Sequence, residues 1–497
     1  MNKKFVFISL IVLSNSLNSF AYYEFDKKLD LAFSSILTLH FTEAELLLQE
    51  EKTEKPGNDL RLLYLNYIDF LKAIITDGKT EFEILKKNSS IRLEELNIDK
   101  NNSSSPFHLF VESEILIQQA LLRIKFNEYI ISAGEIRKAY KLIHNNEKLF
   151  PRFILNKKIS GILNVFVGSV PQQYQWIIKY AGMDGNITDG ITELRTVYLN
   201  IESTSFKSYQ PEILYYIGSI YSAFSIPVDS FFLSEKILSI INSNPLVAFV
   251  FTNILMKQGE NETALDVLNS TLLQESNQSF IYLYYKRGLA RLRKLDYTSS
   301  QDFEYFLIHY KGVNNIKSAY QKLAWVYLIQ GDTIKYKENL RKCIENGVAL
   351  NEDDKAAKEE AESPEICNVY LLRARLYFDG GYYDHSLSEI TGKKIENFSY
   401  YSDQLEVTYR LGRIMQMTGK KDKAINYFEM TIKNGLSSRY YFAANSALML
   451  GLIYEEEKQK IKAELYFKKC LSIKHEQYKN SIDQKALAGL DRIKSMN

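Results

Sequence analysis

A repeated pattern of small and aromatic residues near the C-terminus constrains the fold more than any other feature of this chain. Within residues 405–474, three kinds of residue recur 39 positions apart: Gly412 and Gly451, Ala424 and Ala463, and Phe428 and Phe467. Small residues on facing helix surfaces let two helices approach closely, and an aromatic ring can fill the remaining gap. A repeat period of about 20–50 residues is typical of stacked helical or mixed units that bury their apolar faces on their neighbours.

The spacing and residue types resemble a tandem pair of tetratricopeptide repeats, which are helix–turn–helix units of about 34 residues. The resemblance implies an all-α fold, a right-handed solenoid of helical hairpins. Such a solenoid leaves a concave face on which a partner can bind. Only 8 prolines and 22 glycines occur in 497 residues, which agrees with long helices joined by short turns.

Turns between the two helices of each hairpin can be read from residue 245 onward. They are expected at Gly259, Leu295, Gly331, Gly381, Gly419 and Lys458, at intervals of 36, 36, 50, 38 and 39 residues. The long interval contains a highly charged insertion near 348–363. We interpret it as a solvated helix with i,i+4 ion pairs, because the loop glycine and ligand spacing of an EF-hand calcium site are absent.

A second glycine-rich stretch, residues 161–194, is interpreted as another hairpin with an unusually close helix contact. With Gly185 at its turn, Gly190 falls where Ala424 and Ala463 lie relative to their own turns. The Gly-Lys-Ser/Thr ending of a phosphate-binding loop is missing. The positions predicted to hold the repeats together are Gly185, Gly190, Gly259, Ala264, Gly288, Gly331, Gly412, Ala424, Gly451 and Ala463.

The same stretch resembles the eukaryotic inclusion-body clearance proteins and the tetratricopeptide repeat protein 39 family. The similar features are an apolar helix that begins at Gly161, a glycine-rich turn, and the motif at 190–194. The sequence departs from the family at Met183, where the family has Phe, and at Asn186, where it has Asp. The resemblance places a family-like core at 159–197 and implies a non-enzymatic scaffold linked to inclusion-body and lipid-droplet homeostasis.

The N-terminus has the anatomy of a secretory signal. Lys3 and Lys4 precede an apolar run at 5–13, and Ala21 ends a small-x-small cleavage site. Cleavage there makes Tyr22 the mature N-terminus; an uncleaved anchor is the alternative. The run is much shorter than the roughly 20 residues that span a bilayer, and no later segment is continuously apolar enough. We therefore expect an exported, bacterial version of the family, periplasmic or extracellular, and soluble or peripherally attached, with no transmembrane segment after cleavage.

These patterns divide the chain into three parts. A signal peptide occupies 1–21, degenerate helical repeats occupy 22–200, and tetratricopeptide repeats occupy 201–497, ending in a capping helix at 481–494. The 62 basic and 60 acidic residues are interspersed without a basic stripe, so we do not expect a nucleic-acid partner.

No local motif indicates catalysis, a metal or a cofactor. The six histidines are far apart in sequence, and no nucleophile elbow or Cys-x-x-Cys pair occurs. We therefore expect a non-enzyme. Cys343 and Cys470 are interpreted as small core residues, and a bridge between Cys343 and Cys367 is left open.

The tetratricopeptide register predicts which side chains face a partner. It places on the concave face Tyr282, Tyr285, Trp325, Arg375, Phe378, Tyr409, Arg413 and Asn445, and it buries Tyr327, Tyr377, Leu411 and Tyr454. Aromatic and arginine side chains often dominate binding energy. We expect Trp325, Arg375 and Arg413 to form one binding surface; the alternative is that they fill space between neighbouring helices.

The sequence thus predicts a non-enzymatic helical-repeat scaffold that binds a protein or peptide partner in the cell envelope. A secreted carbohydrate- or lipid-capture protein is the alternative, because secreted nutrient-binding proteins of similar length also carry such repeats.

Overall fold

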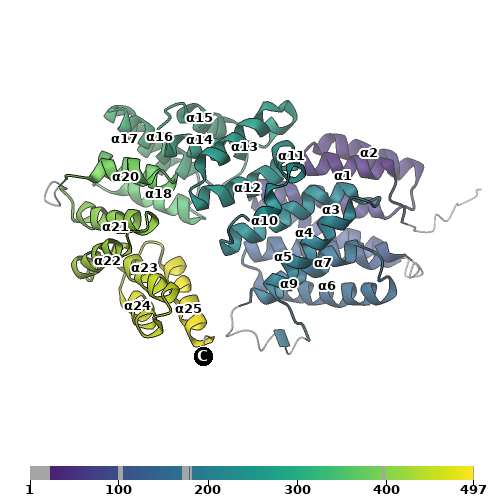
Figure 1. The fold of residues 1–497 in the computed structure, drawn as a ribbon. Helices are drawn as coiled ribbons and strands as arrows, with labels where there is room; N and C mark the ends of the chain where they lie inside the picture. Colours follow the sequence, from purple (N-terminus) through teal and green to yellow (C-terminus); the bar gives the residue numbers. More distant parts are fainter. Residues whose placement is uncertain (1–22, 99–104, 171–177, 180–181, 394–397, 496–497) are drawn as a thin grey trace, which may run out of the picture. The chain divides into compact units, whose positions relative to one another are not determined.

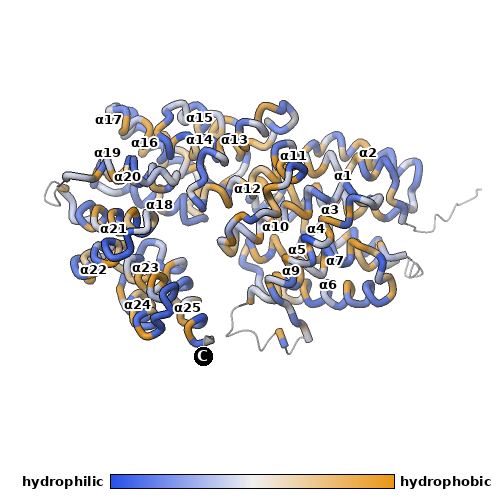
Figure 2. The backbone as a smooth tube through the Cα atoms, in the orientation of Figure 1, coloured by the Kyte–Doolittle hydropathy of each residue, from blue (hydrophilic) through white to orange (hydrophobic). Residues whose placement is uncertain are grey.

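The computed structural model describes residues 23–98, 105–170, 178–179, 182–393 and 398–495, so the predicted signal peptide lies outside the described residues. These residues form helices and no β-strand (Figure 1). Polar and apolar residues are interspersed along the helices (Figure 2), as expected where each helix packs on one face. The predicted all-α, helical-repeat solenoid is confirmed.

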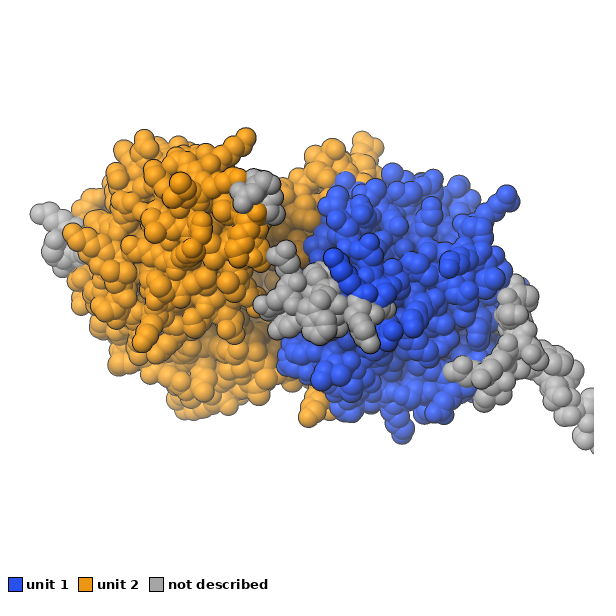
Figure 3. All heavy atoms as spheres, turned by 90° about the horizontal axis from the view of Figure 1, so that it is seen from below, with its two compact units in different colours: residues 1–36, 40–71, 82–208 blue, residues 37–39, 72–81, 209–497 orange. Residues whose placement is uncertain are grey.

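The chain forms two compact units (Figure 3): unit 1 comprises 1–36, 40–71 and 82–208, and unit 2 comprises 37–39, 72–81 and 209–497. The helices wholly or mainly in unit 1 are α1 (Lys27–Leu37), α2 (Phe41–Glu54), α3 (Leu60–Thr76), α4 (Lys79–Ile98), α5 (Pro106–Lys125), α6 (Tyr129–Leu149), α7 (Leu155–Gly168) and α9 (Ile187–Ile201).

Unit 2 begins with α10 (Gln210–Phe224), α11 (Glu235–Ser243), α12 (Pro245–Gln258), α13 (Asn261–Leu273), α14 (Tyr282–Arg293), α15 (Ser299–His309), α16 (Ile316–Ile329) and α17 (Thr333–Glu345). It continues with α18 (Glu352–Glu362), α19 (Val369–Asp379), α20 (Tyr383–Ile390), α21 (Tyr401–Met417), α22 (Lys421–Gly435), α23 (Phe442–Glu456), α24 (Lys460–Ser472) and α25 (Lys479–Ser495). The helix α25, predicted at 481–494, packs against α23 and α24.

Among the described residues, no single helix is long and apolar enough to cross a membrane. The pair α11 and α12 meets the length and composition criteria only when taken together, and the two helices are bent by 111° relative to each other.

The turns within the hairpins of unit 2 share one backbone geometry. The predicted turn residues all have a left-handed backbone, with φ of +80° at Gly259, 60° at Leu295, +84° at Gly331, +83° at Gly381, +73° at Gly419 and 58° at Lys458. The N–H of the next residue bonds back to the helix, as from Gln459 to the Tyr454 carbonyl oxygen at 2.8 Å. This bond satisfies a carbonyl at the helix end. The predicted turn positions are confirmed.

Glycines in the first helix of a hairpin lie against a phenyl ring of the second. A Cβ atom at Gly412 would lie 2.7 Å from the Phe428 ring, and one at Gly451 would lie 2.5 Å from the Phe467 ring. Gly288 has the same relation to Phe303 at 2.9 Å. These distances are too short for a real Cβ contact, which confirms the predicted role of Gly288, Gly412 and Gly451. The small partners Ala264, Ala424 and Ala463 are fully buried.

In unit 1, α7 and α9 also meet through glycine. A Cβ atom at Gly190 would lie 2.5 Å from the carbonyl oxygen of Gly161 and 2.7 Å from Val165 Cγ2. This geometry confirms the predicted close contact between the two helices.

The predicted turn at Gly185 is wrong. The left-handed residue is Gly182, with φ of +70°, whereas a Cβ atom at Gly185 would lie 2.7 Å from the Asn164 carbonyl oxygen. Gly185 is therefore required for close approach to α7, not for the turn conformation. Pro171 and Trp176, which also belong to the family-like stretch, lie outside the described residues.

The core of unit 1 contains a buried ion pair that joins three helices. Lys158 of α7 lies 2.6 Å from the Glu114 carboxylate of α5, and the two side chains are 0% and 1% exposed. Tyr67 of α3 donates a hydrogen bond of 2.9 Å to the same carboxylate. Removal of one partner would leave a buried charge without compensation.

Two turns that are distant in sequence touch each other in unit 2. A Cβ atom at Gly381 would lie 2.1 Å from the Gly259 carbonyl oxygen. The Tyr382 hydroxyl donates to Glu262 at 2.7 Å and accepts from the Asn261 amide at 3.1 Å. The first helical turn of α13 is thereby attached to the turn between α19 and α20.

We predict that Gly412→Ala lowers the free energy of unfolding by about 1–3 kcal/mol, because the methyl group overpacks the Phe428 ring. Gly134→Ala is the matched control: Gly134 is exposed on α6 and has nothing within 4 Å of its Cβ position. Because alanine is the better helix former, this control should raise stability by up to about 1 kcal/mol. Calorimetry measures both effects, and an unchanged or raised melting temperature for Gly412→Ala would contradict the assignment.

Candidate functional site

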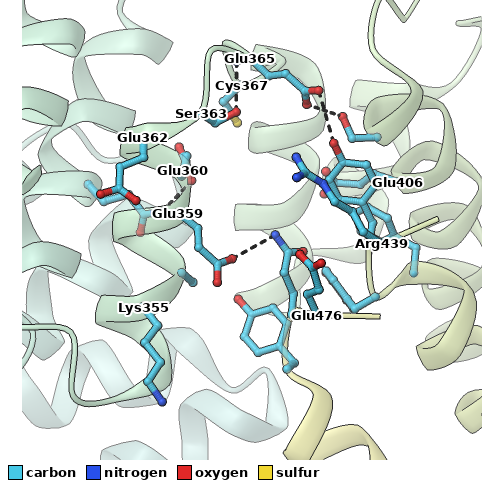
Figure 4. A pocket seen from close by; sticks show the side chains of 18 of the residues that line it. Lys355, Glu359, Glu360, Glu362, Ser363, Glu365, Cys367, Glu406, Arg439 and Glu476 are labelled. Carbon is cyan, nitrogen blue, oxygen red and sulfur yellow. Dashed lines mark hydrogen bonds between the residues drawn. The ribbon is translucent and has the colours of Figure 1, made fainter. Parts of the chain in front are cut away.

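A pocket of about 800 Å³ lies in unit 2, bordered by α16, α18, α19, α21 and the segments that precede α23 and α25 (Figure 4). We call it the α18 pocket. The residues that line it and enter the argument below are Lys322, Trp325, Asp353, Lys355, Glu359, Glu360, Glu365, Cys367, Arg375, Asp403, Glu406, Arg439, Tyr440, Tyr441, Glu476, Gln477, Tyr478 and Lys479.

The helix α18 is the charged insertion that the sequence places between two repeats. Asn351 caps it by accepting the Asp354 N–H at 2.7 Å. Asp354 is fully buried and accepts the backbone N–H groups of Asn315 and Ser318 at 2.6 and 2.9 Å. An anionic side chain at these N–H groups is favourable, because they lie at the N-terminal end of α16.

The interpretation of α18 as a wholly solvated helix is therefore wrong. One face, with Asp354 and Ala357, is buried, and the other carries the predicted i,i+4 pair of Lys358 and Glu362 at 3.7 Å. No group of three or more His, Cys, Asp or Glu side chains in the described part of the chain is placed to hold a metal ion.

Trp325 forms the inner wall of the α18 pocket. Its indole Nε1–H donates to Glu360 at 2.6 Å, and its side chain is nearly buried. Lys322 Nζ lies 3.7 Å and Arg375 Cζ lies 4.4 Å from the centroid of the Trp325 ring. Cation–π contacts of this kind stabilise a charge that has lost water. Burial lowers the pKa of Lys322 to about 8.

The outer part of the pocket is connected by hydrogen bonds across long sequence distances. The Gln477 amide donates to Glu359 of α18 at 3.3 Å, and Glu365 accepts from the Tyr440 hydroxyl at 3.3 Å and from Ser402 at 2.8 Å. Figure 4 shows the side chains of Glu359 and Glu476 projecting toward the same space from different elements.

Asp403 of α21 titrates near neutrality. Burial raises its pKa to about 7, and the nearby carboxylates Glu406 and Glu365 add to the shift. The charged form of Asp403 is thus less favourable than that of an exposed aspartate.

The structure separates the predicted groove residues. Trp325 and Arg375 line the α18 pocket together, whereas Arg413 does not. Arg413 lies over the Phe378 ring at 5.1 Å and donates to the Tyr409 hydroxyl at 3.2 Å. The expected single surface of Trp325, Arg375 and Arg413 is therefore incorrect for Arg413.

Burial contradicts two other groove assignments, those of Tyr285 and Tyr409. Tyr285 is 1% exposed, bonds to Ser318 at 2.9 Å and belongs to the core. Tyr409 is 4% exposed and accepts a 2.7 Å hydrogen bond from Asn445, so these two side chains satisfy each other. Tyr282 is half-buried, packs on neighbouring rings and lies outside the α18 pocket, so its place on the concave face stays a prediction.

Of the residues expected to be buried, Tyr454 is buried, and Tyr327, Tyr377 and Leu411 are only partly covered. Cys343 and Cys470 are fully buried, as predicted, and Cys343, Cys367 and Cys470 are free thiols.

Two parts of the pocket wall were not predicted from the sequence: the acidic face of α18, and the aromatic residues that precede α23 and α25. The sequence did contain one indication of this wall: two consecutive tyrosines, Tyr440 and Tyr441, stand directly before a helix start. The ends of stacked helices lie together at one edge of a solenoid, so aromatic residues at such an end can line a shared surface.

Comparison with known proteins supports a helical-repeat class. The family described as Tetratricopeptide repeat matches residues 444–476, which cover most of α23 and α24. A comparison with curated proteins found no match. The crystal structure of the yeast Tom70 is similar over 94% of this chain and 89% of that chain, at 12% identity and a TM-score of 0.24.

The match at 444–476 defines a tetratricopeptide repeat, and earlier hairpins share its left-handed turn and glycine–ring contact. Unit 2 is thus built of helical hairpins, of which α23 and α24 match a tetratricopeptide repeat.

We predict that Asp403→Asn stabilises the chain more at about pH 8 than at about pH 5. The ordinary aspartate pKa is 3.8 and the folded value is about 7. Between these values the folded chain holds a proton that the unfolded chain has lost, so the wild-type stability falls as pH rises. Asparagine stays neutral and avoids this loss. Melting temperatures at the two pH values test this, with exposed Glu456→Gln as the control; an equal effect at both would contradict it.

Proposed function

We propose that this chain is a non-enzymatic scaffold that binds a segment of a protein partner in the α18 pocket. The observation that carries the proposal is the pocket itself, which is built from elements of several successive repeats and from an inserted helix. Helical-repeat solenoids use extended surfaces across neighbouring repeats to bind partners.

The pocket wall has the mixed character of a polypeptide-binding surface. Tyr440, Tyr441 and Tyr478 supply large rings with few rotatable bonds, and Glu359 and Glu476 supply hydrogen-bond acceptors. A polypeptide offers both backbone N–H donors and side chains to such a wall. We therefore favour a peptide segment as the ligand of this wall of rings and hydrogen-bond acceptors, over the carbohydrate or lipid alternative.

A photocrosslinking experiment tests the proposed site. A benzophenone-bearing amino acid replaces Tyr478, which lines the pocket and is 37% exposed, and the control replaces Ile461 of α24, which is 86% exposed outside it. In extracts of the native cells, position 478 should capture a discrete polypeptide, and position 461 should not.

Mass spectrometry of the crosslink identifies the bound segment, which is then synthesised and titrated into the purified chain. Saturable binding by that segment is expected. Equal capture at both positions, or crosslinks to glycan or lipid only, would disprove a polypeptide site in the α18 pocket.

The proposed cellular setting is the cell envelope. Its basis is the signal-like N-terminus, with Lys3, Lys4 and Ala21. The resemblance of residues 161–194 to the inclusion-body clearance and tetratricopeptide repeat protein 39 families is part of the same proposal, and describes an exported relative of those scaffolds.

Export predicts that the protein purified from its native cells begins at Tyr22. Intact-mass measurement and N-terminal sequencing decide this. A native protein that still begins at Met1 or Asn2 would show that the segment is not cleaved.

A further inference from the structure

Two of the five positive groups of the α18 pocket are paired with carboxylates of the chain. Lys355 pairs with Glu352 at 3.0 Å, and Lys479 pairs with Asp483 at 2.6 Å. Arg375 lies over the Trp325 ring at 4.4 Å. The two lysines are therefore engaged in ion pairs, whereas the Nε and Nη2 atoms of Arg375 have no hydrogen-bond partner.

The pocket is lined by more carboxylates than cationic groups, and several of the carboxylates have no ion-pair partner. Nine carboxylates and five cationic groups line the pocket. Within the described residues, Asp353, Glu359, Asp403 and Glu476 form no ion pair with lysine or arginine at 4.0 Å or less. Carboxylates that gather in one pocket without an ion-pair partner attract cations more strongly than a single carboxylate in open solvent.

The aromatic wall favours the same ligand chemistry. Arg439 lies over the Tyr440 ring at 5.4 Å, so a cation already occupies a ring face at this edge. Tyr441 and Tyr478 present further rings in the same pocket. A guanidinium or ammonium group gains from such faces and from nearby carboxylates at once.

The raised pKa of Asp403 is consistent with the excess of carboxylates, because burial and the neighbouring Glu406 and Glu365 both disfavour its ionised form.

We infer that the partner segment is basic, and that its lysine or arginine side chains bind between Glu359 of α18 and Glu476 of the segment before α25. This inference rests on the proposed function and names the chemistry of the partner for that same site.

Fluorescence anisotropy with short labelled peptides of equal length tests the inference on the chain from Tyr22 onward. The peptides alternate alanine with lysine, serine or glutamate, and spermine serves as a non-peptide cation. The lysine peptide should bind, and added salt should weaken it by screening. In the double variant Glu359→Gln and Glu476→Gln, affinity should fall roughly tenfold, as expected for the loss of two partly exposed charge pairs.

The matched control is Glu338→Gln with Glu456→Gln, which removes two exposed carboxylates outside the pocket and changes the net charge equally. This control should retain the affinity of the unchanged chain. Because glutamine keeps the length of glutamate, both double variants are expected to fold, and circular dichroism verifies it.

Equal losses in the two double variants, or stronger binding of the serine or glutamate peptide, would overturn the inference. Pocket-dependent binding of spermine without that of the lysine peptide would also overturn it, in favour of a free polyamine. If the lysine peptide fails to bind while position 478 still crosslinks a polypeptide, the basic partner is wrong and the proposed function stands. If neither occurs, both are wrong.

Discussion

The contact between a glycine on one helix and a phenyl ring on the next is the constraint on which three hairpins of unit 2 depend, at Gly288, Gly412 and Gly451. At Gly451, the absence of a side chain lets the Phe467 ring lie directly on the helix backbone. The same ring also touches the Cβ position of Gly489 on α25, at 2.5 Å. One buried ring thus sets the spacing of three helices, because interior packing leaves little room for adjustment.

The inserted helix α18 turns this regular stack into a structure with a pocket. Its position depends on Asp354, which bonds to backbone N–H groups of Asn315 and Ser318 at the start of α16. Glu360 on the same helix then meets the Trp325 indole. A buried capping carboxylate and an indole hydrogen bond therefore fix a helix whose outer face is almost entirely charged.

Local patterns in the sequence were sufficient for the repeats but not for the pocket. The turn at Gly419 and the contact of Gly412 with Phe428 depend on residues within one hairpin, so spacing alone predicts them. The burial of Asp354 depends on a helix start 36–39 residues earlier, and that of Tyr285 depends on Ser318, 33 residues later. A register assigns a face to such residues, but it does not reveal which neighbour covers that face.

The contact between Gly259 and Gly381 affects how residues 259–381 can respond to a mechanical force. Open solenoids behave like springs, because each repeat touches only its neighbours. Here the contact between the two glycines joins two turns that are separated in sequence by two hairpins and α18. The hydrogen bonds of Tyr382 with Asn261 and Glu262 reinforce this contact. Stretching or bending of this stretch would therefore have to break these contacts in addition to those between neighbouring repeats.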